Sequence, residues 1–194
     1  MNFDIVLAGV GGQGVLSLSG IIASGAIKEG LFVKQSEVHG MSQRGGAVLA
    51  NLRLSDKPIA SDLIPRGRAA MILSMEPLES LRYVSYLSTE GTLITSTMPM
   101  VNIPNYPDLE ELLGQIRGIP QAILVDSDRL AKSAGSARAA NMVMVGAASH
   151  LLPVKVETMK HYIENVFKKK GEKIIEANLK AFSAGREAFE QTRA

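Results

Sequence analysis

The sequence predicts a single α/β domain with a mostly parallel sheet, helices on both faces and extra C-terminal helices. Short apolar runs alternate with segments of helical periodicity, a pattern typical of parallel sheets covered on both sides. A glycine-rich turn, residues 9–14, joins the first apolar run to the first helical segment. The chain has 194 residues, of which 46% are hydrophobic, enough for one core. We interpret residues 1–194 as one domain whose residues 155–194 form a helical appendage.

Six apolar runs are expected to form strands. The first, residues 3–8, is almost continuously apolar, which is typical of a buried parallel strand. Residues 47–54 alternate in their later part, so one face of that strand is expected to be less buried. The remaining strands are expected at 31–35, 69–73, 91–95 and 122–125.

Helical spacing of apolar residues marks the segments between and after these strands. Residues 15–27 follow this spacing, and Gly30 fits the position just after a helix. Pro77 fits the first turn of a helix over 76–87. Further helices are expected at 108–116, 138–152, 156–168 and 171–189.

The glycine-rich turn has the composition of an anion-binding connection between a strand and a helix. Gly9 and Gly11 are expected to supply the positive φ angles of a tight turn, and Gly14 to let the helix lie close to the strand. Gly12 and Gln13 complete the motif. Amides at the start of the following helix lack partners within the helix and attract phosphate or carboxylate. The turn thus predicts a Rossmann-like fold with an anion site, but no particular reaction.

A polar loop over residues 36–46 follows the second expected strand. In a doubly wound sheet it leaves the same edge as the glycine turn, so we expect the two segments to be neighbours. The guanidinium of Arg44 suits a phosphate or carboxylate. The candidate site residues of this loop are Glu37, His39, Ser42, Gln43, Arg44 and Gly45. We interpret it as a binding loop; the alternative is a surface loop in which Arg44 pairs with Glu37.

Asn141 stands at the head of an apolar helix rich in small residues. Gly146, Ala147 and Ala148 permit close packing of that helix, which would let the Asn141 amide project toward the site. The alternative is a core helix in which Asn141 bonds to backbone. The sequence does not separate the two.

Glu37 also falls about 20 residues after the glycine turn, where a dinucleotide fold carries the acid that binds ribose. This spacing keeps open a second function, that of a free-standing oxidoreductase that binds a nicotinamide nucleotide. Against it, no hydride-transfer site is recognisable further along the chain.

Composition excludes several classes of function. The chain contains no cysteine, so it has no thiolate for an iron–sulfur cluster or a structural zinc, and no thiol nucleophile. Three scattered histidines predict no metal site. A net charge of +2 argues against a nucleic-acid partner, and no apolar stretch is long enough to cross a membrane. Without a signal-peptide pattern or disulfides, we expect a cytoplasmic protein.

Three stretches together resemble a known family. They are Gly-x-Gly-Gly-Gln-Gly at 9–14, Ser-Glu-Val-His-Gly-Met-Ser-Gln-Arg-Gly-Gly at 36–46 and Asn-x-x-x-x-Gly-Ala at 141–147. Residues 4–152 resemble the gamma subunit or domain of 2-oxoacid:ferredoxin oxidoreductases. The second stretch is most similar to the small beta subunit of indolepyruvate ferredoxin oxidoreductases, and next to the gamma subunit of 2-oxoglutarate enzymes. Pyruvate enzymes carry a different loop before the Arg-Gly-Gly.

The resemblance implies an oxidative decarboxylation. A 2-oxoacid, coenzyme A and oxidised ferredoxin give acyl-CoA, carbon dioxide and reduced ferredoxin, with thiamine diphosphate, magnesium and iron–sulfur clusters as cofactors. This chain has no cysteine and no Gly-Asp-Gly segment followed by paired asparagines. The cofactors are therefore expected on larger catalytic partner chains. The present chain is expected to be an accessory subunit, inactive alone, that reaches ferredoxin only through the complex.

The resemblance also implies a location for the site. The gamma domain closes against the cofactor-bearing domains and helps form the side from which coenzyme A enters. The residues that match the motifs are Gly9, Gly11, Gly12, Gln13, Gly14, Glu37, His39, Ser42, Gln43, Arg44 and Asn141. None is expected to be catalytic. Whether they contact coenzyme A or only the partner subunit stays open, a further alternative being that the whole edge is an interface.

Overall fold

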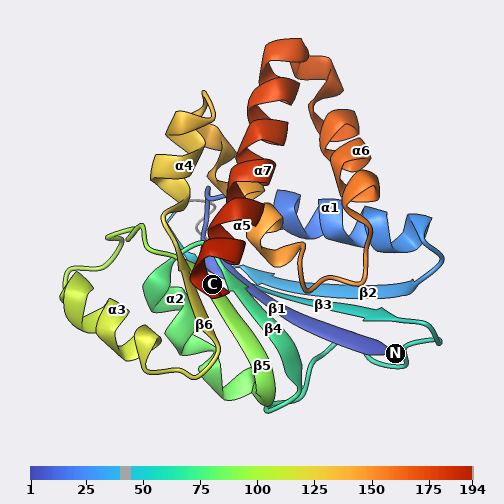
Figure 1. Ribbon diagram of the computed structural model, residues 1–194. Helices are drawn as coiled ribbons and strands as arrows, with labels where there is room; N and C mark the ends of the chain where they lie inside the picture. Colours follow the sequence, from blue (N-terminus) through green and yellow to red (C-terminus); the bar gives the residue numbers. More distant parts are fainter. Residues whose placement is uncertain (40–44, 194) are drawn as a thin grey trace.

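The computed structural model describes residues 1–39 and 45–193. One sheet is formed by β1 (Asn2–Val10), β2 (Phe32–His39), β3 (Ala47–Ser55), β4 (Ala69–Ser74), β5 (Leu87–Ser96) and β6 (Ala122–Val125). Around it lie α1 (Val15–Lys28), α2 (Pro77–Arg82), α3 (Leu109–Arg117), α4 (Ser127–Ser133), α5 (Ala140–Ala148), α6 (Val156–Phe167) and α7 (Glu172–Arg193) (Figure 1). Short 3-10 turns occur at η1 (Val84–Tyr86), η2 (Ala137–Ala139) and η3 (Lys168–Lys170).

The strands lie in the order β2-β3-β1-β4-β5-β6. β1, β4, β5 and β6 run parallel, whereas β3 is antiparallel to both of its neighbours. The predicted fold class, a mostly parallel α/β sheet covered by helices, is confirmed. However, β2 and β3 form a hairpin instead of a crossover, so β3 returns alongside β1 with Val48 opposite Gly9.

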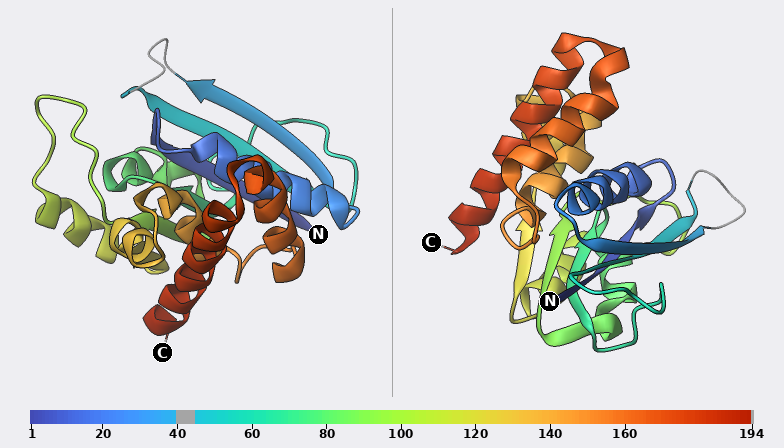
Figure 2. Two further views of the ribbon diagram at one scale, coloured as in Figure 1. Left: turned by 90° about the horizontal axis from the view of Figure 1, so that it is seen from above. Right: turned by 90° about the vertical axis from the view of Figure 1, so that its right-hand side faces the viewer.

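Helices cover both faces of the sheet (Figures 1 and 2). Alternate residues of β1 serve the two faces. Ile5 and Leu7 join the larger hydrophobic cluster with residues of α1, α5, α6 and α7, whereas Val6 joins a smaller cluster with residues of α3. This is the period-two pattern of a strand buried on both sides.

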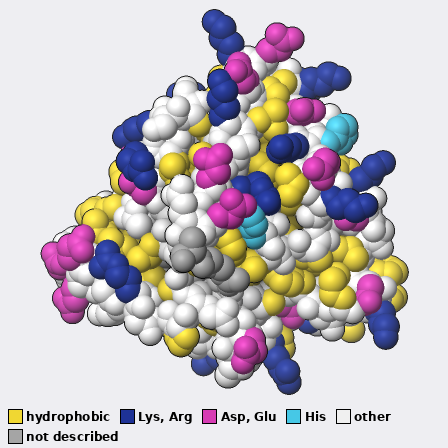
Figure 3. All heavy atoms as spheres, in the orientation of Figure 1, with side chains coloured by type: hydrophobic (Ala, Val, Ile, Leu, Met, Phe, Trp, Pro, Cys, Tyr) yellow, Lys and Arg dark blue, Asp and Glu magenta, His cyan; other side chains and the backbone are white. Residues whose placement is uncertain are grey.

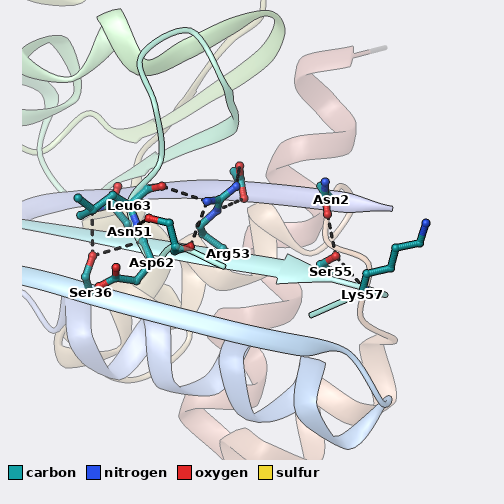
Figure 4. Close-up of polar contacts among 10 residues, drawn as sticks. Asn2, Ser36, Asn51, Arg53, Ser55, Lys57, Asp62 and Leu63 are labelled. Carbon is teal, nitrogen blue, oxygen red and sulfur yellow. Dashed lines mark hydrogen bonds and ion pairs between the residues drawn. The ribbon is translucent and has the colours of Figure 1, made fainter. Parts of the chain in front are cut away.

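Polar side chains on β3 hold the irregular segment that follows this strand. Two nitrogens of Arg53 donate to the carboxylate of Asp4, at 2.9 and 3.0 Å. The third donates to the carbonyl oxygens of Ser61 and Leu63, at 3.1 and 3.0 Å (Figure 4). Bidentate, charged hydrogen bonds are among the stronger polar contacts in proteins. One guanidinium therefore fixes a segment without regular secondary structure against the sheet.

The residues expected as a C-terminal appendage, 155–194, contribute to the main core. α5 is buried along its length, and α7 packs against it with two glycines at the contact. A Cβ on Gly146 would lie 2.0 Å from the Phe182 oxygen, and one on Gly185 would lie 1.9 Å from the Val143 oxygen. Only glycine allows so close an approach of two backbones. α6 and α7 then continue as a helical hairpin beyond the sheet (Figure 1).

Three local expectations differ from the structure. The helix expected over 76–87 ends at Arg82 and is followed by the 3-10 turn η1 and then by β5, which begins at Leu87. Residues 36–39, expected in a loop, form the last half of β2. α4 is not indicated by the apolar spacing; the side chain of Asp126 caps its first turn.

Candidate functional site

The glycine turn connects β1 to α1 at the carboxyl edge of the parallel strands. Positive φ angles occur at Gly12 (+102°) and Gly14 (+82°), so the prediction that Gly9 and Gly11 supply them is wrong. Gly9 is required for packing instead, since a Cβ there would lie 2.8 Å from Cγ2 of Val15. Among the described residues no side chain caps α1, so the amides of its first turn have no side-chain partner there.

Gly14 brings the start of α1 against α5. A Cβ on Gly14 would lie 2.7 Å from Nδ2 of Asn141. Gly14 was expected to allow a close approach between the helix and the strand; the close approach that it allows is between α1 and α5. The first and third sequence motifs, residues 9–14 and 141–147, therefore meet at this point.

Gln13 holds the turn in place. Its Oε1 accepts a hydrogen bond from the Val10 amide at 2.8 Å, and its Nε2 donates to the Met75 oxygen at 3.2 Å. Both polar ends of the side chain are thus used within the protein. Gln13 links the end of β1 to the residue after β4.

The β2–β3 hairpin also meets the turn. The Gly11 amide donates to the Gly46 oxygen at 2.8 Å, and the Gly45 amide donates to the Gly11 oxygen at 3.3 Å. The predicted proximity of the two motifs is confirmed, although it arises from the hairpin and not from a doubly wound strand order. Glu37 is exposed on β2, and His39 ends that strand. Ser42, Gln43 and Arg44 lie outside the described residues.

A cavity of about 470 Å³ opens beside the glycine turn. Its walls come from the residues after β4 and β5 and from the starts of α4 and α5, and include Gly12, Met98, Met100, Ser127, Arg138 and Asn141. We call it the carboxyl-edge cavity. The carboxyl ends of parallel strands are where open α/β sheets bind ligands.

Two side chains of the carboxyl-edge cavity have unused hydrogen-bonding capacity. Asn141 is 9% exposed, and its Oδ1 has no partner among the described residues. A buried oxygen left in this state costs about 1–3 kcal/mol. Arg138 is exposed and pairs with no carboxylate in the described part of the chain. Asp128, the acid in the same wall, is neutralised by Lys132 at 2.6 Å. Arg138 and Asn141 together favour an anionic ligand that also carries a hydrogen-bond donor.

Glu76, which sequence reasoning missed, organises the outer wall. Its side chain is buried, and its carboxylate accepts from the amides of Glu79 and Met100, at 2.8 and 3.3 Å, and from the hydroxyl of Tyr106. It therefore caps α2 and also holds the segment 97–108. The available signal was a carboxylate placed directly between an apolar strand and a helix-starting proline.

Burial changes the titration of two neighbours of Glu76. It raises the pKa of the Tyr106 hydroxyl, and the hydrogen bond to Glu76 adds to the effect. Burial also raises the pKa of Glu79, whose Oε2 has no partner among the described residues. Arg82, at 3.0 Å from the other oxygen, partly offsets this shift. Both groups hold their protons to a higher pH than exposed groups of their type.

A larger hollow, of about 650 Å³, lies between α4, α6 and α7. Its walls include Leu130, Ile175 and Leu179, and none of its lining residues belongs to the three sequence motifs. Hydrophobic side chains lie between charged ones over these helices in Figure 3. Across residues 1–39 and 45–193, no three acidic, histidine or cysteine side chains gather as metal ligands. None of the helices described is long and apolar enough to cross a membrane.

Comparison with known proteins gives matches along nearly the whole chain. The family model for pyruvate ferredoxin/flavodoxin oxidoreductase matches residues 4–188. The chain is 38% identical over 194 residues to indolepyruvate oxidoreductase subunit IorB of Archaeoglobus fulgidus, covering 95% of this chain and 94% of that protein. It is 32% identical over 190 residues to 2-oxoglutarate synthase subunit KorC of Methanothermobacter marburgensis, covering 96% of each.

Solved structures share the fold. Pyruvate oxidoreductase subunit PORC of Thermotoga maritima superposes with a TM-score of 0.74 at 23% identity, covering 96% of each chain. The 2-oxoglutarate:ferredoxin oxidoreductase of Magnetococcus marinus, with 2-oxoglutarate, coenzyme A and succinyl-CoA bound, gives 0.78 at 23% identity. That match covers 98% of this chain but only 31% of the longer one. From the family model and the full-length relatives, the chain belongs to the pyruvate ferredoxin/flavodoxin oxidoreductase family, as its motifs predicted.

Proposed function

We propose that this chain is the accessory, gamma-type subunit of an indolepyruvate:ferredoxin oxidoreductase, which converts an aryl pyruvate, coenzyme A and oxidised ferredoxin into acyl-CoA, carbon dioxide and reduced ferredoxin. The observation that carries the proposal is the 38% identity to a subunit of that name along 95% of the chain. Subunits named for 2-oxoglutarate and for pyruvate or ketoisovalerate are 32% and 30% identical. They define the alternative substrates.

The donor set of this chain supports an accessory role. It has no cysteine to hold an iron–sulfur cluster, and its described residues offer no cluster of acids for a metal-bound diphosphate. Thiamine diphosphate with magnesium, which supplies the carbanion chemistry, and the clusters that take up electrons would therefore be held by larger partner chains. Ferredoxin would be reached through these partners. The absence of cysteine also supports a cytoplasmic location.

Anaerobic co-purification tests the subunit role. The tagged chain is co-expressed with a larger, cysteine-containing chain of the same cell, and the eluate is assayed for coenzyme A-dependent oxidation of indolepyruvate, 2-oxoglutarate and pyruvate. We expect a brown eluate that oxidises indolepyruvate fastest. Preference for another acid would assign the alternative substrate. A colourless, solitary chain stabilised by NAD would instead support the free-standing nucleotide enzyme, since a ligand at 100 times its Kd adds about 2.7 kcal/mol.

Within the complex, the carboxyl-edge cavity is proposed to hold an anionic part of coenzyme A. Arg138 and the α1 amides suit a phosphate, and Asn141 Oδ1 suits a hydroxyl or amide donor of the same molecule. Gly12 leaves room for a ligand to approach the backbone, since no described atom lies within 4 Å of a Cβ placed there.

Replacing Arg138 tests this assignment. Arg138→Ala is expected to raise the KM for coenzyme A about tenfold, the loss of one charged hydrogen bond, and to leave the KM for the 2-oxoacid unchanged. Steady-state kinetics of the complex measure both constants. The matched control is Arg117→Ala on α3, whose only ion pair among the described residues is an exposed one, with Glu110 at 3.7 Å. An equal KM for coenzyme A in the two variants would favour the alternative in which the carboxyl edge is only an interface with the partner.

A further inference from the structure

Hydrogen bonds join the segments around the carboxyl-edge cavity into a closed series. Gln13 Nε2, in the glycine turn, donates to the Met75 oxygen after β4 at 3.2 Å. Asn102 Nδ2, in the segment after β5, donates to the Gly45 oxygen of the hairpin at 2.7 Å. The Gly45 amide then returns to the glycine turn, donating to the Gly11 oxygen at 3.3 Å. One further link, between the residues after β4 and the segment after β5, closes the series.

Glu76 supplies that link. Its carboxylate accepts from the Met100 amide and from the Tyr106 hydroxyl, two points on the segment 97–108. The backbone of Glu76 is fixed by Ser74, whose hydroxyl donates to the backbone carbonyl oxygen of Glu76 at 2.7 Å. Hydrogen bonds to a charged acceptor are roughly twice as strong as neutral ones. The segment is thus attached through a buried charge.

The packing of this segment gives it little other support. No regular secondary structure occurs between β5 and α3, and all of this stretch lies within the described residues. Three of its apolar residues are exposed: Met98 is 47% exposed, Met100 36% and Val101 69%. Because little apolar surface is buried here, polar contacts set where the segment lies. Met98 and Met100 nevertheless form part of the cavity wall.

We propose that Glu76, acting with Tyr106, is a positioning residue for the ligand of the carboxyl-edge cavity; this inference rests on the proposed function. Glu76 does not touch the ligand. It holds Met98 and Met100 in the wall, so that the cavity has its bound shape before the ligand arrives. A site fixed in advance binds more tightly because less ordering is left to occur on binding.

The test removes the Tyr106 hydroxyl in the assembled complex. Tyr106→Phe deletes one donor to Glu76 and keeps the ring. We expect the amides of residues 98–106 to exchange hydrogen about tenfold faster, and the KM for coenzyme A to rise by a similar factor, since one charged hydrogen bond is lost. The value of kcat and the KM for the 2-oxoacid should stay unchanged. The control is Tyr86→Phe, in η1 just before β5, whose hydroxyl makes no hydrogen bond among the described residues.

Two results would overturn the positioning role. One is slow exchange of residues 98–106 in Tyr106→Phe, equal to that of the unaltered complex. The other is faster exchange with no change in the KM for coenzyme A. Arg138→Ala, measured in parallel, separates this failure from failure of the proposed function. If Arg138→Ala raises that KM while Tyr106→Phe does not, only the positioning role is wrong. If neither does, the coenzyme A assignment fails and the positioning role fails with it.

Discussion

Gly14, in the left-handed conformation directly before Val15, sets how α1 leaves the glycine turn. The composition of residues 9–14 predicted a tight turn before a helix, and this is confirmed. Which glycines need positive φ was not predictable, because it depends on the exact register of the turn. The wall-holding role of Glu76 was missed for a similar reason: the two donors that it binds on the segment 97–108 are 24 and 30 residues away in sequence. Spacing along the chain does not reveal such contacts.

Substituting Gly14 should destabilise the protein. Gly14→Ala places a Cβ at φ +82°, which costs about 1–2 kcal/mol, and forces Asn141 to move. Urea unfolding measures the change. Gly20→Ala is the control, because Gly20 lies in α1 with no described atom within 4 Å of a Cβ; it should stabilise by roughly 0.5–1 kcal/mol. Equal midpoints for the two variants would contradict this account.

Glu79 should make stability fall as the pH rises. Its pKa is raised in the folded state, so the folded protein binds more protons than the unfolded chain between the ordinary carboxyl pKa and the raised one. Stability is therefore greatest at low pH in this window and declines as Glu79 ionises. Glu79→Gln removes this ionisation. Between pH 4 and pH 7, the melting temperature of Glu79→Gln should rise relative to that of the unaltered protein as the pH increases. A constant difference between the two melting temperatures over this range would refute the assignment.

At the scale of elements, hydrophobic periodicity predicted most strands and helices close to their bounds. The direction of β3 was not predicted. Extending β2 to His39 leaves only residues 40–46 before β3, a connection suited to a hairpin and too short for a crossover. Periodicity shows that a strand is buried but not which neighbour it pairs with. Likewise, small residues in α5 indicated close packing without indicating α7 as the partner.

The contact between α5 and α7 should not tolerate a methyl group. Gly185→Ala would place a Cβ 1.9 Å from the Val143 oxygen, so the helices must separate, at a cost of about 3 kcal/mol. Gly114→Ala in α3 is the matched control, since none of the described atoms lies within 4 Å of the added Cβ; it should stabilise by roughly 0.5–1 kcal/mol. Urea unfolding of both variants decides. A loss below that caused by Gly14→Ala would show that the crossing is less tight than the structure indicates.

For the whole molecule, the sequence indicated the family, and the comparisons confirm it. Neither the substrate nor the partner follows from the physics of this chain, because it contains no group expected to carry the reaction. The carboxyl edge is where the proposed partner would approach. It combines the cavity, the glycine turn and the exposed apolar residues of the segment after β5.

A charge on this edge should weaken assembly without harming the fold. Val101→Asp alters a side chain that is 69% exposed, so the isolated chain should keep its stability within about 0.5 kcal/mol. Burial of the new carboxylate against a partner should weaken the complex by about 1–3 kcal/mol. Titration calorimetry with the partner measures this loss. Val166→Asp, at a 50% exposed position on α6, is the control and should bind the partner normally. Equal affinities of the two variants for the partner would place the interface elsewhere.

The tight contact between α5 and α7 also has a consequence for biosynthesis. α5 is buried along its length, yet the helix that lies against its glycine begins only at Glu172. While the chain is being translated, the side of α5 that faces α7 stays uncovered after every strand of the described sheet has been made. Chaperones would meet the nascent chain in this interval, and a ribosome that stalled before α7 would release a species prone to aggregate.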